Sequence, residues 1–170
     1  LWGAMTYLGA YAAVHYHLDQ LRVGLLIALF GVGTMVGGAF MAPLRRRLSE
    51  RALAGLGGLL MGIALLTITP GAAARAGAWP LFAAAMLLMG LGLVGLHTTL
   101  QVHGTEISAA ARGKAFSLFP ASLFSGVAVG TAVMGALVDA GGEQAMLAIC
   151  GVGLIAVGIV TARIRRRRMA

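Results

Sequence analysis

The sequence has few charged residues, and this shortage is its most informative property. Charged side chains make up 11% of the 170 residues, whereas a soluble domain has about 25%. Hydrophobic residues make up 59%, and the mean hydropathy is +0.92. Too few polar residues remain to cover a water-exposed surface. The composition therefore excludes a soluble globular enzyme, a disordered chain and a coiled coil, and it indicates a polytopic membrane protein.

Metal ligands and paired catalytic groups are also scarce. The single cysteine, Cys150, excludes an intrachain disulfide and a cysteine-based metal cage. His15 and His17 are two residues apart, so on a helix they would point to different faces. If the serine of F-S-G at 124–126 were a catalytic nucleophile, it would need a histidine in a later helix as its base. The last apolar run has no histidine. We therefore expect no metal, no cofactor and no enzymatic activity.

Six apolar runs follow one another along the chain, separated by short connections. A membrane-spanning helix needs about 20 residues, because each residue rises about 1.5 Å through about 30 Å of hydrocarbon. Five runs are long enough, and the first is roughly 24 Å long by the same rise. Unpaired backbone groups are too costly in lipid, so we predict an all-α fold with one transmembrane domain over residues 1–170. The predicted helices are 1–16, 23–44, 52–69, 80–102, 116–137 and 145–162.

The first residue of the sequence is Leu1, which lies inside an apolar run. The start of the sequence does not resemble a signal peptide. We therefore expect the sequence to be an excerpt of a longer protein that begins partway through a helix. A start codon just before Leu1 would instead favour a self-contained six-helix subunit.

The cations are distributed unevenly between the two sides of the predicted bundle. If the first connection lies outside, the outside carries only Arg22 and Arg75. Positive residues collect on the cytoplasmic side of membrane proteins, so both ends of the chain are predicted to be cytoplasmic. This bias explains the sequence pI of about 11.3 without a nucleic-acid partner. The inside residues are Arg45, Arg46, Arg47, Arg51, Arg112, Lys114, Arg163, Arg165, Arg166, Arg167 and Arg168.

The six predicted helices form two similar triplets. The middle helix of each triplet contains G-x-x-x-G, at 33–37 and at 126–130, and such small residues let helices approach closely in lipid. The third helix of each triplet is short and almost wholly apolar. Because a triplet has an odd number of spans, its two copies face opposite ways, as in many secondary transporters. We therefore predict two inverted three-helix repeats.

Two stretches of the sequence resemble a known family of transporters. The segment A-R-G-K-A-F-S-L-F, followed by S-G-x-x-x-G, runs over 111–130. It resembles the start of the eleventh helix of the major facilitator superfamily, especially its drug- and sugar-efflux branches, where R-G-x-A-x-[SG] precedes a glycine-rich helix. The region from Thr6 through V-G-L-L-I-A-L-F-G-V-G is similar to the same branches. The resemblance covers essentially the whole chain, as helices seven to twelve of a twelve-helix protein.

The resemblance implies a function and a set of partners. The function is secondary active transport of a small molecule, as proton-coupled efflux by alternating access, in the lipid bilayer of the bacterial inner membrane. The partner is the N-terminal six-helix half of the same protein. None of the five acidic residues lies mid-membrane, so a coupling carboxylate would belong to that half. The alternatives are a self-contained six-helix membrane subunit that oligomerises and an intramembrane enzyme.

A second signature of the family is degraded here. The family often carries G-x-x-x-D-R-x-G-R-R after the second helix of each half, and the matching stretch is A-P-L-R-R-R-L-S-E-R. Arg47 and Arg51 match the signature, but Arg46 stands where the acid is expected. Arg47, Arg51 and Arg112 are therefore candidates for gating contacts at cytoplasmic loops. The alternative is plain positive-inside anchoring.

Polar residues at membrane depth are costly, which makes them the default candidates for function. Tyr7, Tyr11 and His15 follow one another at intervals of four and share one face of the first helix. By resemblance, the first and fourth helices of each half line the substrate cavity, so these residues are cavity candidates. The alternative for the tyrosines is an aromatic belt at the membrane surface.

The fourth and fifth helices offer three further cavity candidates. His97 and Gln101 share a face near the cytoplasmic end of the fourth helix, where they would line the inner mouth of the cavity. A helix end that simply runs into water is the alternative. Ser125 shares a face of the fifth helix with Ser117, and its role is either cavity lining or helix packing.

Overall fold

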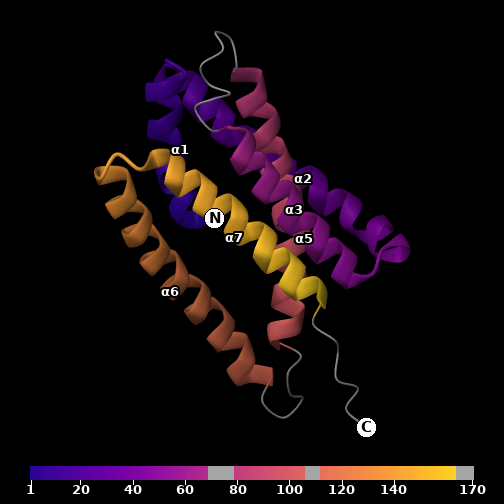
Figure 1. Ribbon diagram of the computed structural model, residues 1–170. Helices are drawn as coiled ribbons and strands as arrows, with labels where there is room; N and C mark the ends of the chain where they lie inside the picture. The colour runs from indigo at the N-terminus through magenta and orange to yellow at the C-terminus, as the bar shows by residue number, and fades with distance from the viewer. Residues whose placement is uncertain (69–78, 106–111, 164–170) are drawn as a thin grey trace.

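Six α-helices account for nearly all of the described chain (Figure 1). The computed structural model describes residues 1–68, 79–105 and 112–163, and these residues contain no strand. Most of the sequence between the third and fourth predicted helices, and residues 106–111 between the fourth and fifth, therefore lie outside the described part. The helices are α1 (Trp2–His15), α2 (Gln20–Arg47), α3 (Glu50–Thr67), α5 (Trp79–Thr105), α6 (Arg112–Asp139) and α7 (Glu143–Arg163).

Five of these helices, α2, α3, α5, α6 and α7, are long and apolar enough to cross a membrane. The fifth predicted span begins earlier than expected, because α6 starts at Arg112 instead of residue 116. Apolar composition marks where lipid surrounds a helix, whereas backbone hydrogen bonding continues into the polar flanks. The same reason explains why α2 extends beyond 23–44 at both ends. α1, with 14 residues, is the short one.

α3 lies between α5 and α7 and contacts both along its length. A Cβ atom placed on Gly57 would lie 2.5 Å from the carbonyl oxygen of Gly92 in α5. A Cβ atom on the adjacent Gly58 would lie 2.6 Å from the Cα atom of Gly158 in α7. Two neighbouring glycines of one helix thus admit two different helices at backbone contact, as small residues do in membrane bundles.

The two G-x-x-x-G motifs play different roles in the bundle. In α2, Gly33 and Gly37 both face α5, and a Cβ atom on Gly37 would lie 3.4 Å from the Cα atom of Leu91. In α6, Cβ atoms on Gly126 and Gly130 would meet nothing within 4 Å. The backbone of Gly130 is nevertheless approached by α1, because a Cβ atom on Gly3 would lie 2.7 Å from its carbonyl carbon. The first motif therefore packs against α5 at both glycines, whereas the second leaves open space beside Gly126.

α6 is the least covered helix of the bundle. It packs mainly against α1, and Figure 1 shows it standing apart from α7 away from the turn that joins the two. Phe116, Leu118, Phe124 and Val129 are each 63–70% exposed. The buried core lies instead where α1, α2, α3, α5 and α7 meet. Its most buried large residues include Leu8, Tyr11, Leu65, Phe82, Met86 and Leu147.

Consecutive helices run in opposite directions, so their connections alternate between two ends of the bundle (Figure 1). We call the end where α2 finishes and α3 begins the basic end. Among the described residues, Arg22 is the one Lys or Arg at the opposite end. This separation of charge agrees with the asymmetry predicted from the sequence. The residues of the basic end are Arg45, Arg46, Arg47, Arg51, Arg112, Lys114 and Arg163.

Candidate functional site

The polar face of α1 contacts a different helix at each of its three residues. The hydroxyl of Tyr7 donates to the carbonyl oxygen of Thr131 in α6, at 3.3 Å. The hydroxyl of Tyr11 donates to the carbonyl oxygen of Ile68, just after α3, at 2.9 Å. The tyrosines and His15 do share a face, and that face forms polar contacts within this chain. Whether it also lines a substrate path stays a prediction.

Tyr11 is the most enclosed residue of this face. Its side chain is only 2% exposed, and its ring centroid lies 4.5 Å from that of His15. The neighbouring Tyr16 also points its hydroxyl toward Ile68, with 3.4 Å between the two oxygens. The carbonyl oxygen of Ile68 thus accepts hydrogen bonds from two tyrosine hydroxyls. These bonds replace the partners within the helix that carbonyl groups at a helix C-terminus lack.

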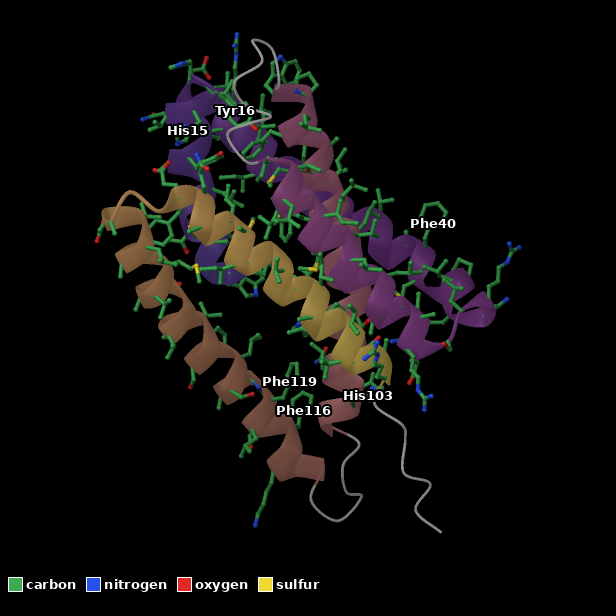
Figure 2. All side chains as sticks on the ribbon, viewed as in Figure 1. His15, Tyr16, Phe40, His103, Phe116 and Phe119 are labelled. Carbon is green, nitrogen blue, oxygen red and sulfur yellow. The ribbon has the colours of Figure 1, made fainter. Side chains whose placement is uncertain are left out.

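His15 contacts the first residue of α7. Its Nε2 atom meets Oε2 of Glu143, and both side chains are 30% exposed. Figure 2 shows His15 at the end of α1 nearest the start of α7. Sequence reasoning noted only that no acidic residue lies mid-membrane, and it missed this contact. The available signal was topological, since the first helix must end on the side of the membrane where the last one begins.

A cavity of about 360 Å³ lies among the first turn of α1 and helices α3, α5, α6 and α7. His97 lines it from α5, and its ring centroid is 5.8 Å from that of Phe119 in α6. Most of the remaining wall is apolar, with Leu96, Val127 and Leu154 among its members. The cavity is therefore mostly apolar, with one imidazole in its wall.

The other candidates of α5 and α6 lie elsewhere. Gln101 and Ser125 are exposed and do not line the cavity. Ser122 lines it instead, with its hydroxyl donating to the carbonyl oxygen of Phe119 at 2.8 Å. Sequence reasoning chose Ser125 for its spacing from Ser117. The better signal was the spacing of four from Ser122 to Gly126, which puts both on the wall of the cavity.

The predicted gating arginines sit at the basic end. Arg47 is the last residue of α2, Arg51 follows the start of α3, and both side chains are exposed. Between them, the hydroxyl of Ser49 accepts from the backbone N–H of Ala52 at 3.2 Å and caps α3. Arg112 is the first residue of α6, and its side chain lies outside the described part. The gating role of the three arginines stays a prediction.

The described residues contain no group of three His, Cys, Asp or Glu side chains that would hold a metal ion. The polar contacts of Tyr7, Tyr11 and His15 reach other parts of the bundle, and five of the helices are long and apolar enough to cross a membrane. The family model of the Major Facilitator Superfamily matches residues 1–169. Comparison with curated proteins and with solved structures gives no significant match. The chain therefore belongs to the major facilitator superfamily, whose members are membrane transporters.

Proposed function

We propose that this chain is the C-terminal six-helix half of a secondary active transporter that exports a small molecule by alternating access, coupled to protons. The family match over residues 1–169 is the observation that carries the transport assignment. The R-G-x-A-x-S sequence from Arg112 to Ser117 supports the efflux branch and the C-terminal half. The uneven distribution of cations supports a cytoplasmic basic end, and the membrane we propose is the bacterial inner membrane.

The helix contacts support two inverted three-helix repeats. If the triplet α1, α2 and α3 is exchanged with α5, α6 and α7, the contact of α2 with α5 becomes that of α6 with α1. Both contacts occur, and the contact of α3 with α7 maps onto itself. The match is incomplete because α7 touches the short α1 far less than α3 touches α5.

The cavity with His97 is proposed as this chain's contribution to the substrate path. It is bordered by α1, α5 and α6, the three helices expected from the sequence to form that wall, and also by α3 and α7. The first helix contributes Leu1, Trp2 and Gly3 to it, and not the predicted face of two tyrosines and a histidine. An apolar wall with one imidazole suits a small, mostly apolar solute that carries one hydrogen-bonding group. The N-terminal half would cover the exposed faces of α6 and α2, where Phe124 is 70% and Phe40 64% exposed.

Transport by cells that express the full-length gene tests the proposal. Accumulation of a panel of labelled small molecules should fall on expression and recover when a protonophore collapses the proton gradient. His97→Ala should remove most of this effect at an unchanged amount of membrane protein. If no compound responds to expression, or if His97→Ala exports like the wild type, the proposal is wrong.

His17→Asn provides the matched control. His17 is exposed, does not line the cavity and has a φ of 51°. Asparagine tolerates this left-handed conformation better than most residues, so the exchange removes an imidazole without straining the backbone. Export by His17→Asn should equal that of the wild type.

A further inference from the structure

A groove of about 550 Å³ runs along α2 beside the start of α5. Its floor includes Leu26, which is 4% exposed, and its rim includes Leu25 at 59% and Val32 at 45%. The one charged residue in its lining is Arg22, in the first turn of α2, and Trp79 lines it from the first residue of α5. The groove therefore has a polar end and an apolar length.

The length of the groove matches one leaflet of a bilayer. Arg22, Leu25, Leu29 and Val32 follow one another at intervals of three or four, so they form a stripe along one face of α2. Ten residues of helix separate Arg22 from Val32, which corresponds to about 15 Å. The hydrocarbon of one leaflet is half of about 30 Å. A lipid chain that starts at Arg22 would therefore end near Val32, at the bilayer midplane.

Arg22 has hydrogen-bonding capacity to spare. Its Nε atom lies 3.6 Å from Oδ2 of Asp19, and its side chain is 67% exposed. The two terminal NH₂ groups have no hydrogen-bond partner among the residues that the structure describes. The carboxylate of Asp19 already caps α2, with its Oδ1 accepting from the backbone N–H of Arg22 at 2.8 Å, so the free capacity lies on the guanidinium and not at the helix end. Phosphate suits the guanidinium fork, and tryptophan favours the depth of lipid headgroups.

We propose that this groove binds one phospholipid, with its phosphate against Arg22 and Trp79 and one acyl chain along Leu25, Leu29 and Val32. A packed helix fits less well, because the open glycines that would admit one closely lie on another face of α2. Cβ atoms on Gly24, Gly31 and Gly38 would meet nothing within 4 Å, and none of the three lines the groove. The proposal needs only that α2 and α5 span the membrane, so it is independent of the substrate cavity.

Photo-crosslinking tests this site in the full-length protein. The probe is phosphatidylglycerol with a diazirine in the middle of one acyl chain, in nanodiscs, and labelled residues are mapped by mass spectrometry. Labelling should concentrate on residues 25–32. Arg22→Gln should reduce it about tenfold, as expected for the loss of a charge-assisted hydrogen bond. The matched control, Arg51→Gln, removes an exposed arginine at the other end of the bundle and should leave labelling of 25–32 unchanged.

Two further experiments separate the contribution of the lipid phosphate from that of the acyl chain. Diacylglycerol with the same diazirine lacks the phosphate, so its weaker labelling of 25–32 should not respond to Arg22→Gln. Ala28→Phe places a ring in the groove lining while Arg22 remains, and it should also reduce labelling by phosphatidylglycerol. Gel filtration of each variant checks that it is folded. Absence of labelling at 25–32, or equal labelling of wild type and Arg22→Gln, would overturn the proposal.

Discussion

At the scale of single residues, the polar side chains of α1 attach a short helix to its surroundings. Tyr7 contacts α6, Tyr11 contacts the end of α3, and His15 contacts α7. Hydrogen bonds between membrane helices stabilise by about 0.6 kcal/mol on average, and individual bonds reach about 1.7 kcal/mol. Three such contacts are a substantial part of what holds a helix of 14 residues.

The contact of His15 with Glu143 should appear as a coupling energy. We expect the double-mutant cycle of His15→Gln and Glu143→Gln to give about 0.5 kcal/mol, because both side chains are partly exposed and solvent screens the pair. The measurement is the free energy of unfolding of the purified full-length protein in mixed micelles. The cycle of Asp19→Asn and Arg22→Gln is the control and should give nearly zero, since those side chains are 63% and 67% exposed. Equal coupling in the two cycles would contradict the assigned contact.

Sequence reasoning found the residues of this face but not their partners. Spacing alone groups Tyr7, Tyr11 and His15, because a helix repeats every 3.6 residues. Spacing says nothing about which helix lies opposite. A face of phenols and an imidazole predicts a polar neighbour, and here that neighbour is backbone for the tyrosines and Glu143 for His15.

At the scale of helices, close packing at glycine determines which helices are neighbours. Adjacent glycines let α3 meet α5 at Gly57 and α7 at Gly58. In lipid no hydrophobic force drives helices together, so such backbone contact and the dispersion it brings must stabilise the bundle. α6 has one comparable approach, where a Cβ atom on Gly3 of α1 would lie 2.7 Å from the carbonyl carbon of Gly130. Much of the rest of α6 is exposed.

Adding a methyl group at Gly58 should therefore lower the free energy of unfolding, whereas adding one at a glycine with open space beside it should raise it. Gly58→Ala puts a Cβ atom 2.6 Å from the Cα atom of Gly158, so α3 and α7 must separate. We expect a loss of about 1–3 kcal/mol in the free energy of unfolding. Gly153→Ala, with nothing within 4 Å, should gain up to about 1 kcal/mol from helix propensity. If both variants unfold like the wild type, the close approach of α3 and α7 is wrong.

The spans could be predicted from the sequence, but the faces of the helices could not. Apolar runs locate five spanning helices because lipid requires about 20 apolar residues in each. The lipid-facing and buried sides of such a helix are both apolar, so hydropathy does not separate them. Met35 in α2 is 76% exposed, whereas Met86 in α5 is fully buried. The same limit explains why the two G-x-x-x-G motifs looked equivalent in the sequence.

At the scale of the whole molecule, charge and hydrophobicity determine how the bundle sits in a membrane. Six helices alternate in direction, and the described cations other than Arg22 lie at one end. A membrane potential and anionic lipids favour that end on the cytoplasmic side. The exposed apolar faces of α2 and α6 then meet either lipid or the other half of the proposed transporter.

The central claim is that this chain spans the membrane with its basic end in the cytoplasm, and the two ends of α6 test it most directly. Lys114 and Asp139 are exposed and lie near opposite ends of this helix. In full-length protein whose native cysteines are replaced, Asp139→Cys should react in intact cells with an impermeant thiol reagent. Lys114→Cys should react only after permeabilisation. Labelling of both sites in intact cells, or the reverse pattern, would contradict the account.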